Sequence, residues 1–83
     1  MANLLKQLRK ENNQKDQHLS KENQLLMTDM VVYLRGSKLC EYDIEVIRRD
    51  LFGMIYEAQM RGETAGQVIG DDYKGFCDEL MCS

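Results

Sequence analysis

Apolar side chains recur every three or four residues along most of this chain, and this spacing places them on one face of an α-helix. The clearest example lies near the end of the chain, at Tyr73, Phe76, Cys77, Leu80 and Met81. A helix of this length is marginal alone in water, so we expect it to dock on the longer helices that precede it.

A second helix is predicted to start around Ser20 and to run to Arg35. Ser20 is a suitable N-cap, because its hydroxyl oxygen can accept a hydrogen bond from a free N–H group of the first turn. The buried face of this helix should consist of Leu26, Met27, Met30, Val31 and Leu34. We expect Gly36 to end the helix in the left-handed conformation that glycine adopts at low cost. The short connection that follows predicts antiparallel packing of the next helix.

The longest helix is predicted from about Glu41 to Arg61. Its main apolar stripe is formed by Ile44, Ile47, Leu51, Ile55 and Ala58. Further apolar residues widen this stripe beyond one face, and they are Val46, Phe52, Met54, Tyr56 and Met60. A helix that is apolar on several sides either lies centrally or holds a partner. We also expect ion pairs Glu45–Arg49 and Glu57–Arg61, and Gly62 should end the helix.

The first 18 residues look different, because three leucines are followed by a wholly polar run from Arg9 to Gln17. We expect a weak helix from about Ala2 to Asn12 that docks by its leucines and breaks at Asn12–Asn13. Residues 1–18 are therefore predicted to form a polar arm, and residues 19–83 a core.

The region after Gly62 is predicted to contain one short helical turn at Thr64–Val68, capped by Thr64. Gly75 lies inside the last helix, and we expect it to allow close backbone approach to the long helix. Together these segments predict an all-α fold, a compact bundle of four to five helices within a single domain of 83 residues.

Charge is unevenly distributed along the chain, whose formal net charge is −3. Residues 1–24 carry five basic against three acidic side chains, whereas the rest carries six against eleven. No apolar run approaches the roughly 20 residues that span a bilayer, and the three cysteines come without a visible secretion signal. We therefore expect a cytoplasmic protein with reduced thiols, and membrane helices beyond residue 83 remain an open alternative.

The sequence contains no catalytic motif, so we do not expect an enzyme, a cofactor or a metal. His18 is the only histidine, and Lys15 three residues earlier excludes the Glu-x-x-His pair of a helical di-iron site. A zinc site formed by His18, Cys40, Cys77 and Cys82 would lack the local spacing of known zinc ligands. Its position on the apolar face predicts that Cys77 is a core residue. A further interpretation is a redox or metal sensor that uses reactive thiols at Cys40 and Cys82.

Nucleic-acid binding has weak support in the sequence. The candidate recognition helix Asp71–Met81 carries four acidic side chains against Lys74, and these would repel phosphates. The body of the protein has one candidate anion-binding cluster, formed by Arg35, Lys38, Arg48 and Arg49.

Several segments resemble a group of small bacterial helical domains of unknown function. They are Leu19–Asn23, Tyr33–Arg35, Glu57–Gln59 with Arg61–Gly62, and the ending Gly70-Asp-Asp-Tyr73 with Phe76-Cys-Asp-Glu-Leu80. The group includes the domains labelled Dps-like and the related HAAS-type signalling domains. The resemblance covers residues 19–81 and implies an all-α fold without known catalytic residues. It further implies an association with PadR-like transcriptional regulators or a role as the cytosolic head of a membrane protein.

These observations favour a noncatalytic helical interaction or regulatory module that binds a protein partner or a second copy of itself. Phe52, Tyr56 and Met60 of the long helix are the candidate contact residues, although all three can equally be core residues. The alternative is a nucleic-acid-binding protein, acting directly or within a regulator complex, that uses the Arg35, Lys38, Arg48 and Arg49 cluster.

Overall fold

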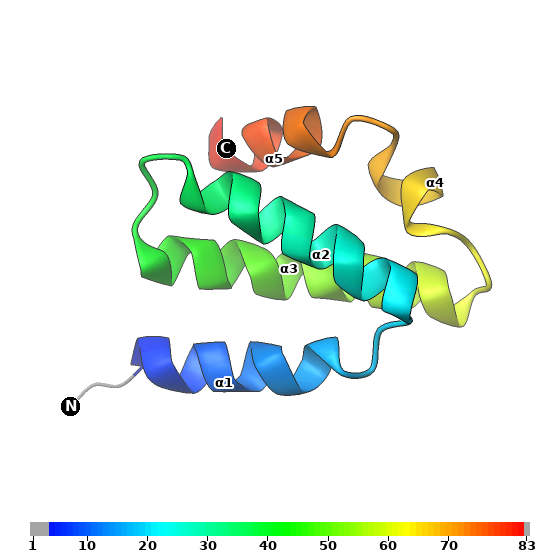
Figure 1. Cartoon of the computed structure of the whole chain (residues 1–83), viewed down its shortest axis with the longest axis horizontal. Coiled ribbons are helices and arrows are strands. Elements are labelled where there is room, and N and C mark those ends of the chain that lie inside the picture. The colour runs from blue at the N-terminus through cyan, green and yellow to red at the C-terminus, as the bar shows by residue number, and fades with distance from the viewer. Residues whose placement is uncertain (1–3, 83) are drawn as a thin grey trace.

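The structure, a computed structural model, describes residues 4–82, and this part of the chain forms five α-helices, whose arrangement is shown in Figure 1. They are α1 (Leu4–Asp16), α2 (Lys21–Arg35), α3 (Glu41–Met60), α4 (Ala65–Ile69) and α5 (Tyr73–Cys82). Residues 4–82 contain no strand, so the predicted all-α fold is confirmed. The start predicted for the first helix, Ala2, lies outside the described residues.

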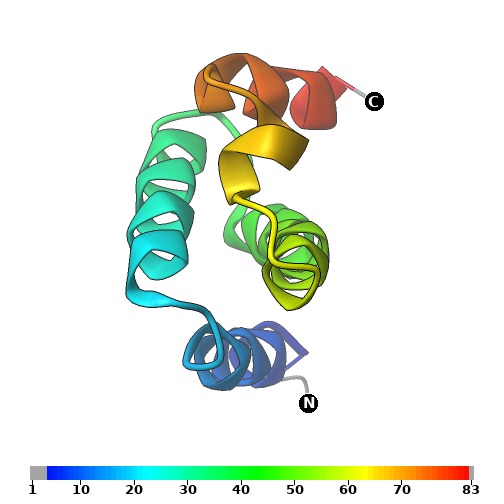
Figure 2. The same cartoon turned by 90° about the vertical axis from the view of Figure 1, so that its right-hand side faces the viewer.

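α1 and α3 run from left to right in Figure 1, and α2 runs antiparallel to both. Viewed from the end, they occupy the corners of a triangle, while α4 and α5 lie above α2 and α3 (Figure 2). α3 packs against α1, α2 and α4, and α5 packs across α2. The last helix therefore docks on a longer helix as predicted.

The core forms where the apolar faces of α2, α3 and α5 meet. Its fully buried side chains include Met27, Met30, Leu34, Leu51, Ile55 and Cys77. Each such aliphatic side chain contributes about 1.5–3 kcal/mol relative to an exposed position. The periodicity of the sequence located this core correctly, including the burial of Cys77.

The junction between α1 and α2 is held by hydrogen bonds to Gln59 of α3. The Ser20 hydroxyl accepts from the backbone N–H of Asn23 at 3.2 Å, which confirms the predicted N-cap. The side-chain oxygen of Gln59 accepts from the Ser20 N–H at 2.8 Å, and its amide donates to the His18 carbonyl at 2.9 Å. α3 therefore fixes the point at which α2 begins.

The left-handed conformation predicted for Gly36 is wrong, because its φ of −78° and ψ of −5° are right-handed. The Gly36 N–H instead donates to the carbonyls of Val32 and Tyr33. Both the N–H and the hydroxyl of Ser37 donate to the Leu34 carbonyl, at 3.1 and 2.5 Å. Ser37 thus supplies the C-terminal hydrogen bonds, and no left-handed residue is needed.

Gly62 does terminate α3 as predicted, in the left-handed conformation with φ of 77°. The Glu63 N–H donates to the Ala58 carbonyl at 2.8 Å, and the Gly62 N–H donates to the Gln59 carbonyl at 3.1 Å. These two bonds form a Schellman motif, which satisfies carbonyls that the helix end leaves free.

The expected ion pairs Glu45–Arg49 and Glu57–Arg61 do not form. Glu45 instead contacts Arg48 at 3.2 Å, and Arg61 contacts Glu63 at 2.9 Å. Glu45 lies on the side of α3 that faces α1, where a partner three residues away is within reach. Arg61 lies beyond the last turn of α3, so its nearest acid is in the following loop.

The explanation predicted for Gly75 is also wrong. A Cβ at Gly75 would meet the carboxylate of Asp72 rather than the backbone of α3. The Asp72 side chain accepts from the Gly75 N–H at 3.0 Å and thereby caps the start of α5. The glycine leaves space for this cap. The short helix α4 begins as predicted after Thr64, whose backbone N–H donates to the Gln67 side chain at 2.9 Å.

α1 is longer than the predicted arm helix. It continues through Asn12 and Asn13 to Asp16, so the predicted break is wrong. The amide of Asn12 is buried and donates to the backbone carbonyl of Glu45 at 2.9 Å and to its carboxylate at 3.0 Å. Asp16 forms an ion pair with Arg48 at 2.5 Å. Tertiary contacts therefore hold residues helical that their own propensities do not favour.

Candidate interaction surface

One side of α3 is not covered by another described helix. In the end view, α1 lies below α3, α2 beside it and α4 above it, and the remaining side is open (Figure 2). The residues on this side follow one another at alternating spacings of four and three. We call them the outer face of α3, and they are Tyr42, Val46, Arg49, Gly53, Tyr56 and Met60. Side chains with this spacing form the seam by which two helices pack against each other.

The outer face is apolar at most positions and accessible along its length. Met60 is 66% exposed and Tyr42 46% exposed, while Val46 and Tyr56 are half-buried. From Tyr42 to Met60 the face extends about 27 Å, at 1.5 Å per residue. Gly53 lies near its middle, and a Cβ placed there would meet no atom within 4 Å. The fold itself therefore gives no steric reason for a glycine at this position.

A shallow hollow lies on each side of the outer face. The hollow toward α1 has a volume of about 210 Å³ and includes Leu4, Tyr42 and Arg49 in its lining. The hollow toward α5 has a volume of about 270 Å³ and includes Val46 and Met81. Side chains from a helix laid along α3 would therefore find depressions on both flanks.

The predicted contact residues Phe52, Tyr56 and Met60 are only partly on this surface. Phe52 and Tyr56 are half-buried, and their rings stack with centroids 5.2 Å apart and planes 14° apart. Phe52 and Tyr56 both pack against the core, whereas Met60 is exposed at the end of the helix. Tyr42 was not among the predicted contacts, although it falls in register with Tyr56 at a spacing of fourteen residues.

A polar network occupies the interface between α1 and α3. Glu45 is 1% exposed, and its carboxylate accepts from Asn12 and pairs with Arg48. The Arg48 guanidinium also donates to Asn13 at 2.7 Å and pairs with Asp16. Two oppositely charged buried groups that are each hydrogen-bonded in this way position helices rather than bind ligands. The sequence signal was present, because Arg48 falls inside the apolar stripe between Ile44 and Leu51.

The predicted basic cluster is divided by the fold. Arg48 is engaged in the polar network, and Arg49 lies on the outer face of α3. Lys38 is exposed in the loop between α2 and α3. The structure therefore does not gather the four side chains into one anion-binding surface.

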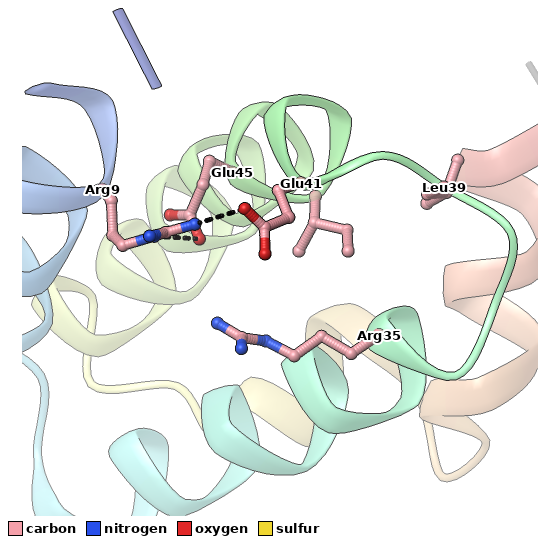
Figure 3. Close-up of a pocket in the computed structure, with 6 residues that line it drawn as sticks. Arg9, Arg35, Leu39, Glu41 and Glu45 are labelled. Atoms are coloured by element: carbon pink, nitrogen blue, oxygen red, sulfur yellow. Dashed lines mark hydrogen bonds and ion pairs between the residues drawn. The ribbon is translucent and has the colours of Figure 1, made fainter. Parts of the chain in front are cut away.

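Arg35 shares a hollow of about 330 Å³ with Arg48, whose guanidinium is paired there with Asp16. Arg35 also lines a hollow of about 220 Å³ together with Arg9, Glu41 and Glu45. Figure 3 shows the Arg35 guanidinium directed into this space opposite Arg9. Arg9 pairs with Glu41 at 3.1 Å and with Glu45 at 3.8 Å. Two arginines and two glutamates balance in charge, so the hollow offers an anion no excess of positive charge.

The cysteines and the histidine lie in different parts of the fold. Cys77 is completely buried, and burial raises the pKa of its thiol, with a further contribution from Asp78. Cys40 is exposed at the start of α3, His18 is exposed in the loop before α2, and the side chain of Cys82 lies outside the described residues. Among residues 4–81, no three His, Cys, Asp or Glu side chains are placed to hold a metal ion.

One hydrogen bond ties α5 to α2. The Tyr33 hydroxyl donates to the Asp78 carboxylate at 2.6 Å, and this bond raises the pKa of the tyrosine above its usual 10.0. The Lys74 ammonium lies 5.9 Å from the centre of the Tyr33 ring. These contacts fix α5 on α2, and Leu80 and Met81 near the end of α5 border the outer face of α3 beside Val46.

Comparisons with protein-family models, with curated proteins and with solved structures found no match to this chain. Within the described residues, no helix combines the length and the apolar character required to cross a membrane.

Proposed function

We propose that this protein is a noncatalytic helical interaction module that binds a protein partner through the outer face of α3. The proposal includes action in the cytosol and, following the sequence resemblance, a PadR-like regulator as one candidate partner. The polar network between α1 and α3 holds α1 along one border of this face.

The observation that carries the proposal is the uncovered line from Tyr42 to Met60, in which four apolar side chains, two exposed and two half-buried, flank Arg49 and Gly53. Contiguous exposed apolar surface on a small protein marks an interaction site, whereas isolated exposed apolar residues are common. Leu25 and Val32 of α2 are also exposed, at 64% and 62%, but they are two residues with Thr28 and Asp29 between them. The outer face of α3 instead runs the length of the longest helix.

Nucleic-acid binding has less support. Phosphate recognition requires several free cationic groups on one surface. Arg48 is committed to Glu45 and Asp16, and Arg49 lies away from Arg35 on a different hollow. Arg35 and Arg48 do share a hollow, but Asp16 of the same hollow pairs with Arg48, so the geometry gives this alternative little support.

The test places a photo-crosslinking benzoylphenylalanine at Tyr42 or Met60 of the full chain in its native cells. We expect a crosslinked partner of defined mass from both positions and none from the control positions Leu25 and Val32. The partner is then identified, purified and titrated. We expect Tyr42→Glu/Met60→Glu to weaken binding at least about tenfold and Leu25→Glu/Val32→Glu to leave it unchanged. Equal crosslinking from the α2 positions, or none from α3, would refute the proposal.

A further inference from the structure

An acidic line runs beside the outer face of α3. Asp43, Asp50 and Glu57 are each seven residues apart, and each directly follows a residue of the face, namely Tyr42, Arg49 and Tyr56. All three acidic side chains are exposed. Seven residues correspond to nearly two turns, so the three carboxylates lie one above another along the helix.

These carboxylates have no partner among the described side chains. Over residues 4–81, the structure gives no side-chain hydrogen bond or ion pair for Asp43, Asp50 or Glu57. The other acids of α3 are engaged, since Glu41 pairs with Arg9 and Glu45 with Arg9 and Arg48. The division follows the helix: acids that face α1 are neutralised, and acids beside the open face are not.

The position of the acidic line matters for helix packing. In a two-helix seam, the residues that flank the apolar positions form the ion pairs that select the partner. The opposite flank of the seam is formed by Glu45, Phe52 and Gln59, which are buried or half-buried. Glu45 is bonded to α1, Phe52 packs against the core and Gln59 is bonded to the loop before α2. One flank is therefore available for charge recognition, and it is uniformly acidic.

We infer that the outer face of α3 binds an amphipathic helix whose seam is apolar and whose flank facing Asp43, Asp50 and Glu57 carries Lys or Arg at seven-residue spacing. This inference rests on the proposed function and specifies the chemistry of the partner. The open space at Gly53 admits a large partner side chain or a close backbone, and the two hollows accept the neighbouring side chains.

A second copy of this chain fits the surface less well. In antiparallel packing, equivalent flanks of the two helices face each other. Two copies would then bring six unpaired carboxylates to the same side of the seam, and like charges in this position oppose association. Charge complementarity therefore favours a basic helix over a second α3.

The test uses three labelled amphipathic peptides of 28 residues with one leucine seam and flanks of Lys, Gln or Glu. Binding to the intact protein is followed by fluorescence anisotropy at low and at moderate salt. We expect the Lys peptide to bind most tightly, the Glu peptide least, and salt to weaken the Lys complex. The triple variant Asp43→Lys/Asp50→Lys/Glu57→Lys should lose about 10- to 100-fold in affinity for the Lys peptide and gain affinity for the Glu peptide.

The matched control is Glu22→Lys/Asp29→Lys/Glu79→Lys, which changes the net charge equally at exposed acids away from α3. Each triple also contains one acid from the first turn of a helix, Asp43 or Glu22, so the effects on helix ends are comparable. An equal loss in this control would overturn the inference, because it would indicate attraction to overall charge. Circular dichroism establishes that each variant is folded.

Failure of the inference and of the proposed function are distinguishable. If Tyr42→Glu/Met60→Glu abolishes partner binding but reversal of the acidic line does not, the interaction face stands and the basic helix is wrong. If neither set of substitutions weakens partner binding, both the proposed function and the inference of a basic helix are wrong. Sedimentation of the protein alone completes the test, since a dimer that Met60→Glu dissociates would identify a second copy as the occupant and overturn the inference.

Discussion

The carboxylate of Glu45 is almost fully buried, and its partners come from α1 and from its own helix. Asn12 donates to it at 3.0 Å, and Arg48 contacts it at 3.2 Å. Arg48 in turn reaches Asp16 and Asn13 of α1. Apolar residues at both Glu45 and Arg48 would pack well together. Replacing only one of the two residues leaves the charge of the other buried and without its partner.

We predict that Arg48→Met destabilises the protein by about 2–4 kcal/mol, because Glu45 and Asp16 lose their main cationic partner. Arg49→Met is the matched control, since the adjacent Arg49 is exposed and outside the network. Its effect should stay within about 0.5 kcal/mol. Urea denaturation followed by circular dichroism measures both. Equal stabilities of the two variants would show that the network contributes nothing to folding.

At the scale of single residues, sequence reasoning found the apolar side chains and missed their polar neighbours. The burial of Met27, Leu51 and Cys77 followed from periodicity alone. The roles of Asn12 and Glu45 did not, because a residue pair 33 positions apart is brought together only by packing. Arg48 shows where sequence reasoning fails at this scale. Its charge predicted an exposed anion contact, whereas its position in the apolar stripe indicated a buried side chain.

Two of the longer helices, α3 and α5, each contain one glycine, and these two glycines have different surroundings. Gly53 of α3 has no atom within 4 Å of its would-be Cβ. Gly75 of α5 lies under the capping carboxylate of Asp72. Glycine inside a helix costs about 1 kcal/mol of stability relative to alanine. Within the fold, only Gly75 offsets this cost, because its missing side chain leaves room for the Asp72 cap.

We predict that Gly53→Ala stabilises the isolated protein by about 0.5–1 kcal/mol. Gly75→Ala should give no net gain, because displacement of the Asp72 cap offsets the better helix propensity. Thermal denaturation of both variants makes the comparison. If Gly75→Ala stabilises the protein as much as Gly53→Ala does, the Asp72 cap contributes nothing to the free energy of unfolding.

The boundaries of the helices followed from local signals where those signals are strong. Ser20 and Gly62 mark the start of α2 and the end of α3 as predicted, since capping depends on residues within one turn. Gly36 marks the end of α2 as predicted, but its left-handed conformation was predicted wrongly, because Ser37 supplied an alternative set of hydrogen bonds. The end of α1 was also predicted wrongly, because α3 stabilised a segment whose own sequence is a weak helix former.

For the molecule as a whole, the docking of α5 on α2 links stability to pH. Burial raises the pKa of Cys77 above its usual 9.0, and the hydrogen bond to Asp78 raises that of Tyr33 above 10.0. Both groups are neutral in the folded state at pH values where the unfolded chain already ionises. Their stabilising contribution is therefore complete below about pH 9 and is lost as the pH rises through the folded pKa values.

We predict that the free energy of unfolding is steady between about pH 7 and pH 8.5 and falls above about pH 9. Cys77→Ala should lower stability at neutral pH through the cavity it leaves, but the fall above pH 9 should be shallower. Cys40→Ala is the matched control, because that thiol is exposed and should leave the wild-type slope unchanged. Urea titrations at each pH measure these slopes, and parallel curves for all three proteins would contradict the prediction.

The sequence by itself determined the all-α class, a bundle of four to five helices, the antiparallel pairing of α2 and α3 and most of the core. These properties depend on the 3.6-residue period and on capping, which are local. The tertiary structure alone decided which side of α3 stays open, because α3 is apolar on several sides and its sequence does not specify which side each neighbour covers. It also decided which acids are neutralised, since Glu45 meets Arg9 and Asn12 only when α1 packs against α3, while Asp43, Asp50 and Glu57 remain beside the outer face.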